Sequence, residues 1–337
     1  MSPPQKIIAL AGGTGTIGSS ILAALLQDPN KAYKPIILSR ATQQQEAGTT
    51  PFSIPHVEAY SIPNIDIETR YVDYTSLPSL TTALQGVHTL LSTLLIPGPE
   101  SVTYQLNLLT AAISAGVTRF APSEFALNQE AHKLVEIDAG KILVWDAVLS
   151  AVKEGKIDAA TFPVGMFMNY LAIGVPDKER QKEGLAGFRE GAMMFHLDGN
   201  QGEAWVEVPV DETGEWPDVT MTDIRDVGRF VVAALGIEEA WGGRELGIAG
   251  DTRSLRDVVG VLRRVLRREI RVEEVSPGEL KKRRDEYGEG DILAKMEIDY
   301  VAVCGRGGSV VEGVLNRLCP EVKATSIEEF VIKYWAS

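Results

Sequence analysis

The chain has 337 residues, 45% hydrophobic and 23% charged, which is typical of an ordinary globular protein and excludes an intrinsically disordered one. Its formal net charge is −13, from 33 Lys and Arg against 46 Asp and Glu, and so acidic a surface argues against nucleic-acid binding. Two cysteines and four scattered histidines provide neither a disulfide scaffold nor a zinc-ligand spacing, so we expect no metal.

The amino terminus lacks the basic-then-apolar pattern of a signal peptide. No apolar run approaches the roughly 20 residues that cross a bilayer. We therefore expect an intracellular, cytoplasmic protein that contacts no membrane and acts as a monomer or homodimer. The length allows one large domain or two closely joined domains.

The first predicted element is a strand that leads through a glycine-rich turn into a helix. Residues 7–11 are apolar, Gly12, Gly15 and Gly18 follow three apart, and apolar residues then recur at helical spacing over 17–25. In such a unit the first glycine permits the tight turn, the second lets the backbone approach a pyrophosphate, and the third lets helix and strand pack closely. The helix amino terminus attracts the phosphate charge. We therefore predict a dinucleotide site, against the alternative of a tight turn that binds nothing.

Strand and helix patterns alternate through the rest of the first half. This alternation predicts an α/β fold with a doubly wound parallel sheet of the Rossmann type and helices on both faces. Residues 42–55 are polar and rich in chain breakers, and we expect a loop there. The expected strands are 35–39, 70–73, 87–92, 119–122 and 157–162, and the expected helices are 77–84, 101–115 and 138–153.

The end of the second strand selects the nucleotide. A carboxylate there would bind the ribose hydroxyls of NAD, whereas a guanidinium pairs with the 2′-phosphate of NADP. The chain has Arg40 at this position and no Asp or Glu nearby, so NADP(H) is preferred. The alternative is that Arg40 is an exposed residue at a strand end.

After residue 163 the pattern loosens into a smaller, mixed α/β part. We expect strand-like pieces around 193–196 and 205–210, a helix at 223–235, and a strand at 244–248 that extends the sheet. The remainder is expected to be largely helical, with capping boxes that begin at Ser276 and Ser326. The NAD(P)-binding domain is then 1–162 with about 218–250, and the substrate-binding part is 163–217 with 251–337. We expect a cleft between them, over the carboxyl ends of the strands.

Several segments together resemble the NmrA-like, isoflavone-reductase-like branch of the atypical short-chain dehydrogenases, most closely its fungal members. The resemblance covers almost the whole chain, and residues 119–125 (Arg-Phe-Ala-Pro-Ser-Glu-Phe) are its most specific marker. The chain departs from the family at Ala126, where a glycine is usual. None of the nine tyrosines has a lysine four residues later, which disfavours ordinary short-chain dehydrogenase chemistry. The other matching segments are 12–18, Arg40, 84–87, Gln105, 115–118, 139–141, 163–167, 222–228 and 324–330.

The resemblance implies that Lys141, on the helix after strand five, is the catalytic acid/base. An ammonium in a dry cleft loses hydration, which would lower its pKa and make it a usable proton donor or acceptor. The alternatives are that Lys141 is an ordinary solvated lysine, like Lys153, or that Lys133 has the role. Ser123 is the second catalytic candidate, as a hydrogen-bonding group for the nicotinamide ribose or a substrate oxygen, or else only a turn residue.

The remaining site residues follow from their positions in the predicted fold. Met166, Phe167 and Tyr170 are expected in the substrate pocket, although core packing is an alternative for Phe167 and the methionines, which also include Met168, Met193 and Met194. The expected cofactor contacts are Gly12, Thr14, Gly15, Thr16, Ile17, Gly18, Arg40, Ser92, Phe125, Lys141, Pro163 and Gly165.

The chain is therefore expected to be an NADPH-dependent reductase, with a role in secondary metabolism. It would transfer hydride to an electron-poor carbon of an aromatic or conjugated small molecule, with Lys141 managing the proton. The alternative is an NmrA-like sensor that binds NAD(P) without turnover and acts through protein partners. Sensors of this kind lack the catalytic lysine, so its presence favours the enzyme.

Overall fold

The computed structural model describes residues 5–40, 49–52, 60, 66–96, 98, 100–188, 193–198 and 204–336. The chain divides into two compact units. The first comprises Met1–Phe125, Gly140–Phe162 and Val227–Leu246, and the second comprises Ala126–Ala139, Pro163–Asp226 and Gly247–Ser337. In the described part of the chain, no helix is long and apolar enough to cross a membrane.

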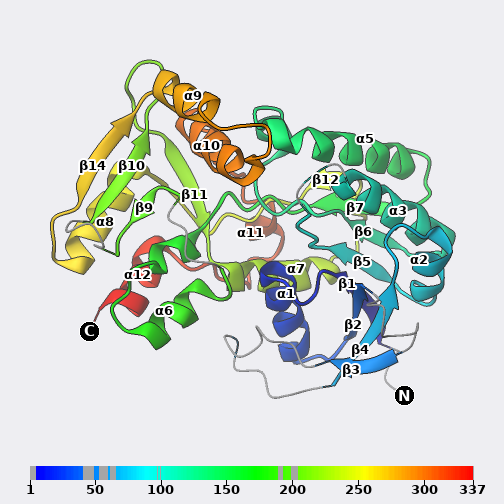
Figure 1. Ribbon diagram of the computed structural model, residues 1–337. Helices are drawn as coiled ribbons and strands as arrows, with labels where there is room; N and C mark the ends of the chain where they lie inside the picture. The colour runs from blue at the N-terminus through cyan, green and yellow to red at the C-terminus, as the bar shows by residue number, and fades with distance from the viewer. Residues whose placement is uncertain are drawn as a thin grey trace. The chain divides into compact units, whose positions relative to one another are not determined.

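The first unit is built on one large sheet (Figure 1). Among the described residues seven neighbouring strands run parallel, and an eighth, β3, pairs antiparallel with β4 at the edge. The order is β12 (Arg244–Glu245), β7 (Asp158–Thr161), β6 (Arg119–Ala121), β5 (Thr89–Ser92), β1 (Lys6–Ala11), β2 (Tyr33–Arg40), β4 (Ile67–Val72) and β3 (Thr49–Phe52). Strand order reverses between β1 and β5, which confirms the doubly wound Rossmann-type fold.

Two sequence expectations for this sheet have definite outcomes. The strand expected at 244–248 does extend the sheet, because Arg244 and Glu245 pair in parallel with Ala160 and Thr161. The loop expected over 42–55 is wrong for residues 49–52, which form β3. The rest of that segment lies outside the described residues.

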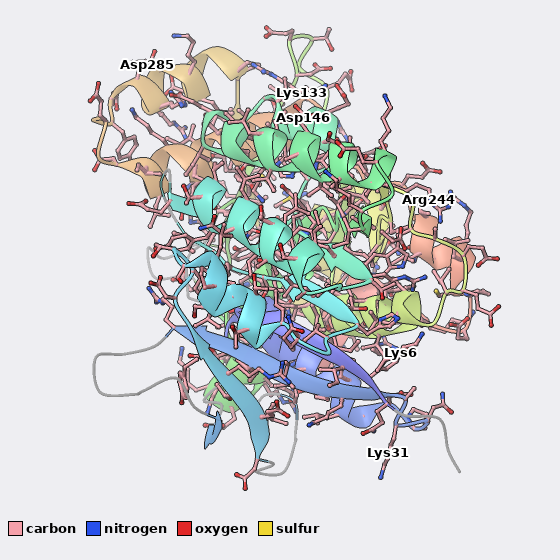
Figure 2. The ribbon with its side chains drawn as sticks, turned by 90° about the vertical axis from the view of Figure 1, so that its right-hand side faces the viewer. Lys6, Lys31, Lys133, Asp146, Arg244 and Asp285 are labelled. Carbon is pink, nitrogen blue, oxygen red and sulfur yellow. The ribbon has the colours of Figure 1, made fainter. Side chains whose placement is uncertain are left out.

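Helices cover both faces of the sheet. On one face α2 (Leu77–Ala83), α3 (Glu100–Ser114) and α5 (Ala139–Lys153) lie side by side (Figure 2), and their apolar residues join those of the strands in one core cluster. The opposite face carries α1 (Thr16–Gln27) and the part of α7 (Ile224–Leu235) that belongs to this unit (Figure 1). These two helices are in contact, since a Cβ atom on Gly228 would lie 2.4 Å from the Ser20 carbonyl oxygen.

The second unit contains two three-stranded sheets. One has the order β14 (Arg271–Val275), β10 (Trp205–Pro209), β9 (Phe195–His196), and the other β13 (Asp251–Ser254), β11 (Asp218–Thr222), β8 (Met166–Phe167). The chain after residue 250 is largely helical, as expected, but it also contains strands β13 and β14. The helices are α4 (Gln129–His132), α6 (Lys178–Leu185), α8 (Leu255–Leu266), α9 (Pro277–Asp285), α10 (Ile292–Gly305), α11 (Val314–Leu318) and α12 (Ile327–Trp335), with 3₁₀ turns at Glu136–Asp138 and Met168–Ala172.

Of the two expected capping boxes, one is complete. The Ser326 side chain accepts the Glu329 backbone N–H, and the Glu329 carboxylate accepts the Ser326 N–H in return, so α12 begins as predicted. At α9 the Ser276 side chain accepts the Glu279 N–H, and Pro277 occupies the first turn. Among the described residues, the return bond from the Ser276 N–H to the Glu279 carboxylate is not present, so this capping box is incomplete.

Candidate active site

The β1–α1 turn has the geometry that its three glycines predict. Gly12 has a φ of +85°, and a Cβ there would lie 3.0 Å or less from Thr93 atoms. A Cβ on Gly18 would lie 2.3 Å from the Gly12 carbonyl oxygen, so only glycine lets the helix pack this closely on the strand end. The Gly15 N–H donates to the same oxygen at 2.9 Å, which closes the turn.

The amino end of α1 is suited to an anion. Its N-cap is Gly15, no acidic residue occupies its first turn, and among the described residues no side chain is seen to cap it. By contrast, serine side chains cap the backbone N–H groups at the start of α2, α8, α9 and α12. Gly15 is exposed, and Thr14, Thr16 and Ile17 are half-buried around it. A helix end of this kind attracts phosphate oxygens through its dipole and backbone donors.

Thr93 anchors this turn, and sequence reasoning missed it. It directly follows β5, and its hydroxyl donates to the carbonyl oxygens of Ala11 at 3.2 Å and Gly12 at 3.0 Å. Its N–H also donates to Ala11, at 2.8 Å. The one available signal was its place after the strand next to β1, where the strand order reverses.

A buried glutamine connects the carboxyl ends of β5 and β6. The Gln105 side chain, on α3, donates to the Ser92 hydroxyl at 2.9 Å and accepts the Ser123 N–H at 3.4 Å. Ser92 is fully buried. Its hydroxyl therefore serves this internal bond, and its part in cofactor binding stays a prediction.

Lys141 lies where the sequence resemblance puts it, in the first turn of α5. Its Nζ donates to the Ser123 carbonyl oxygen at 3.1 Å and to Glu124 Oε2 at 3.2 Å. The Glu124 side chain is 2% exposed and that of Lys141 is 29% exposed, so the carboxylate is interior and the lysine side chain is partly exposed. The structure thus brings together Ser123 and Lys141, the two catalytic candidates, through the serine backbone.

Glycine also explains how α5 reaches the end of β6. A Cβ on Gly140 would lie 2.6 Å from Val102 Cγ2 on α3, so a larger residue would push the start of α5 away. Glu124 itself was given no role from the sequence. Its position beside a strand-end serine in the most specific family segment was a signal, but its partner is 17 residues away and becomes visible only in the fold.

Arg40 is exposed at the end of β2, which both interpretations of this residue allow. In the part of the chain that the structure describes, no carboxylate forms an ion pair with it. The neighbouring Tyr74 donates its hydroxyl to the Leu38 carbonyl oxygen at 3.0 Å. Burial raises the pKa of Tyr74, and the positive charge of Arg40 acts in the opposite direction. Arg40 is therefore a solvent-facing cation next to β2, which suits a phosphate.

Other expected cofactor residues are interior in their own units. In the first unit, the Phe125 ring is buried and stacks on Phe162 at 5.8 Å between centroids. In the second unit, Pro163 is buried, and a Cβ on Gly165 would lie 2.4 Å from the Thr220 carbonyl oxygen. Any contact of these residues with a cofactor remains a prediction.

Ala126, where the family usually has a glycine, has a backbone conformation that an alanine adopts without strain. Its carbonyl oxygen accepts the N–H groups of Val164 and Gly165, both at 2.9 Å. Ala126 is not among the residues with positive φ, so this position does not require glycine.

The expected substrate residues form part of an aromatic cluster in the second unit. Phe188, which sequence reasoning missed, lies 4.7 Å from Phe167 and 5.3 Å from Tyr170 between ring centroids. Burial, with a smaller contribution from Glu297, raises the pKa of Tyr170 to about 12, so its hydroxyl stays protonated at neutral pH. Met166 is buried, as are Met168 and Met194, whereas Met193 is half-buried.

The alternative lysine, Lys133, is a surface residue (Figure 2). Its Nζ lies 2.6 Å from Glu130 Oε1, and the two side chains are 54% and 82% exposed. Such a solvated pair gives little electrostatic perturbation. The described residues contain no group of three or more His, Cys, Asp or Glu side chains arranged to hold a metal.

Comparison with known proteins finds a family match and a curated relative. The model of the NmrA-like family matches residues 4–331. The "Oxidoreductase BOA1" of Botryotinia fuckeliana (strain B05.10) is 30% identical over 261 residues, which are 75% of this chain and 74% of that protein.

Two solved structures show the same fold at low sequence identity. One, of pinoresinol-lariciresinol and phenylcoumaran benzylic ether reductases, has a TM-score of 0.70 at 18% identity and covers 98% of this chain and 100% of its own. The other, described as AtPrR2 with NADP+ and (+)pinoresinol, has a TM-score of 0.69 at 15% identity and covers 98% of both chains.

Proposed function

This chain belongs to the NmrA-like family, and on that premise we propose that it is an NADPH-dependent oxidoreductase of the isoflavone-reductase type. Its substrate is an aromatic or conjugated small molecule with an electron-poor carbon that accepts hydride. The oxidoreductase name of the fungal relative and the NADP+ and pinoresinol of the structural neighbour support this proposal.

The cofactor assignment is supported by two features of the first unit. The uncapped amino end of α1, beside the Gly12 and Gly18 close contacts, fits a diphosphate. The exposed guanidinium of Arg40 fits the additional 2′-phosphate of NADPH. Bound there, NADPH supplies the hydride from C4 of its nicotinamide. Thr14, Thr16 and Ile17 would border the diphosphate.

The observation that carries the proposal is the position of Lys141 at the carboxyl end of β6. Its Nζ is held by the Ser123 carbonyl oxygen at 3.1 Å and by Glu124 Oε2 at 3.2 Å. When hydride adds to a conjugated carbon, electron density moves to an adjacent oxygen, which then needs a proton or a cation. We assign this task to Lys141, and a hydrogen-bonding task to Ser123.

We assign the substrate side to 163–217 and 251–337, the division expected from the sequence. Within that part Met166, Phe167 and Tyr170 are the proposed contacts, and Phe188 joins them because it packs against both rings. Half-buried aromatic side chains of this kind stack on planar aromatic ligands. The residues 189–192 after Phe188 lie outside the described residues.

The test is NADPH oxidation by the purified protein with a panel of conjugated aromatic ketones, enones and quinones. Lys141→Met should lower kcat by about 10²- to 10⁴-fold, the usual contribution of a general acid or base. Lys153→Met, on the exposed face of the same helix, is the matched control and should retain wild-type kcat.

Two other outcomes are informative. Tight NADPH binding with no oxidation against any member of the panel would favour a sensor that acts through protein partners. Unchanged turnover in Lys141→Met would remove the acid/base assignment and leave the cofactor assignment intact.

A further inference from the structure

Glu124 is a carboxylate almost completely removed from water. It directly follows Ser123 after β6, and its side chain is 2% exposed. A carboxylate in such a place is strongly disfavoured as an anion unless cations or hydrogen-bond donors surround it. The Nζ of Lys141 is such a donor, at 3.2 Å from Oε2.

The backbone around Glu124 fixes where this carboxylate lies. The Glu124 carbonyl oxygen accepts the Phe162 N–H at 3.1 Å, next to β7, and the Glu124 N–H donates to Pro122 at 2.8 Å. The next residue, Phe125, stacks on Phe162. These contacts hold the backbone of Glu124 in place, and the Lys141 amine reaches its carboxylate at 3.2 Å.

Both acceptors at Lys141 favour its charged form. An ammonium has three N–H donors and no acceptor, and here it meets a carbonyl oxygen at 3.1 Å and a carboxylate oxygen at 3.2 Å. An opposite charge and hydrogen bonds at this range stabilise the ammonium against the loss of hydration. Both contacts act against the effect that loss of hydration would have on the charge of Lys141.

We propose that Glu124 is a positioning residue that holds Lys141 as an ammonium, so that Lys141 acts in the reaction as the proton donor. The inference rests on the proposed reductase function. A substrate carbon accepts the hydride, its π electrons move to the conjugated oxygen, and that oxygen takes a proton from Lys141 Nζ. The neutral amine, on a side chain that is 29% exposed, then regains a proton from the solvent, and bound NADPH would be the source of the hydride.

Other ionisable groups lie near this end of α5. Glu100 is in the first turn of α3, and Asp146 is exposed further along α5 (Figure 2). Asp138 precedes Lys141 by three residues, and its carboxylate is bonded to His132 Nδ1 at 2.8 Å and to the Tyr300 hydroxyl at 3.0 Å. A test must therefore change Glu124 alone and read the charge of Lys141 directly.

The direct readout is acetylation of Lys141 by acetic anhydride at a series of pH values, followed by mass spectrometry, because only the neutral amine reacts. Glu124→Gln keeps the shape of the side chain and removes its charge. At a given pH we expect acetylation of Lys141 to be faster by about tenfold or more, since a close opposite charge is lost. The matched control is Glu130→Gln, which should hardly change acetylation of the exposed Lys133.

The kinetic readout is the pH profile of kcat. Glu124→Gln should move the loss of activity at high pH toward lower pH, because Lys141 gives up its proton more readily. The KM of the substrate and the affinity for NADPH should change little. Glu124→Asp, which keeps the charge but moves it one methylene away from Lys141, should shift the profile in the same direction by a smaller amount.

Each outcome decides something. Unchanged acetylation of Lys141 in Glu124→Gln would overturn the inference, even in an active enzyme. Faster acetylation in a protein that oxidises no NADPH would contradict the reductase proposal and still support control of the Lys141 charge by Glu124. If Glu124→Gln does not fold, as judged by circular dichroism, Glu124→Asp replaces it. The aspartate carboxylate lies farther from Lys141, so we expect a smaller increase in the rate of Lys141 acetylation. An unchanged rate would overturn the inference.

Discussion

Lys133 and Lys141 lie eight residues apart, and each has a carboxylate partner within ion-pair distance. Lys133 and Glu130 are both largely exposed, whereas Glu124 is interior and Lys141 is half-buried. Water screens the first pair, so its energy is small, and the interior position of the second makes each charge depend on the other. At the residue scale, burial of the carboxylate partner distinguishes Lys141, the proposed proton donor, from the surface residue Lys133.

Arg40 permits a prediction at the same scale. Arg40→Ala should weaken NADPH binding by about 10- to 100-fold, the equivalent of one or two hydrogen bonds to a charged group. NADH binding should be unchanged, because NADH lacks the 2′-phosphate, and it serves as the internal control. Fluorescence titration with each coenzyme measures both constants. An equal loss for NADPH and NADH would show that Arg40 supports the fold instead of reading the phosphate.

At the scale of elements, residues that pack locally were predictable and residues that pair over distance were not. The β1–α1 unit followed from its own glycine spacing and helical period. Strand β14 was missed because Val272 and Val275 stand three apart, as in a helix, among charged residues. Strand β13 (Asp251–Ser254) has no apolar residue, so it gives no alternation, and pairing with β11 alone makes it a strand.

The α1 element gives a prediction about close packing. In Gly18→Ala the new Cβ would lie 2.3 Å from the Gly12 carbonyl oxygen, so strand and helix must separate. We expect a loss of about 1–3 kcal/mol in the free energy of unfolding and weaker NADPH binding.

The matched control is Gly260→Ala, also within a helix, where no atom of the described residues beyond the adjacent residues and the helix's own backbone lies within 4 Å of the new Cβ. It should raise stability by up to about 1 kcal/mol through helix propensity. Urea denaturation of both variants provides the comparison. If Gly18→Ala were as stable as Gly260→Ala, the close contact at the turn would not exist in solution.

For the whole molecule, the alternation of strands and helices predicted the sheet of the first unit. The family resemblance identified Lys141 as a candidate site residue on the helix after β6. The partners of the site did not follow, because each joins segments that are distant in sequence. Thr93 reaches Gly12, Gln105 reaches Ser123, and Glu124 reaches Lys141. Such pairs depend on which strand ends lie next to each other in the fold. The residue types alone do not predict that arrangement.

Burial of both cysteines gives a prediction for the whole molecule. Cys304 and Cys319 are free thiols, and burial raises the pKa of both, to about 12 for Cys304. A raised pKa keeps a thiol protonated and unreactive at neutral pH. We expect a thiol reagent at pH 8 to label neither cysteine rapidly in the folded protein and both after denaturation. Immediate labelling of two thiols per folded chain would contradict this burial.

The central claim is that the β1–α1 turn binds NADPH on the unit that holds Lys141. Isothermal titration calorimetry of the wild-type protein tests it most directly. The account predicts saturable binding of one NADPH per chain, with weaker binding of NADH. The absence of binding heat for both coenzymes, from a protein that is folded by circular dichroism and over several temperatures, would contradict it.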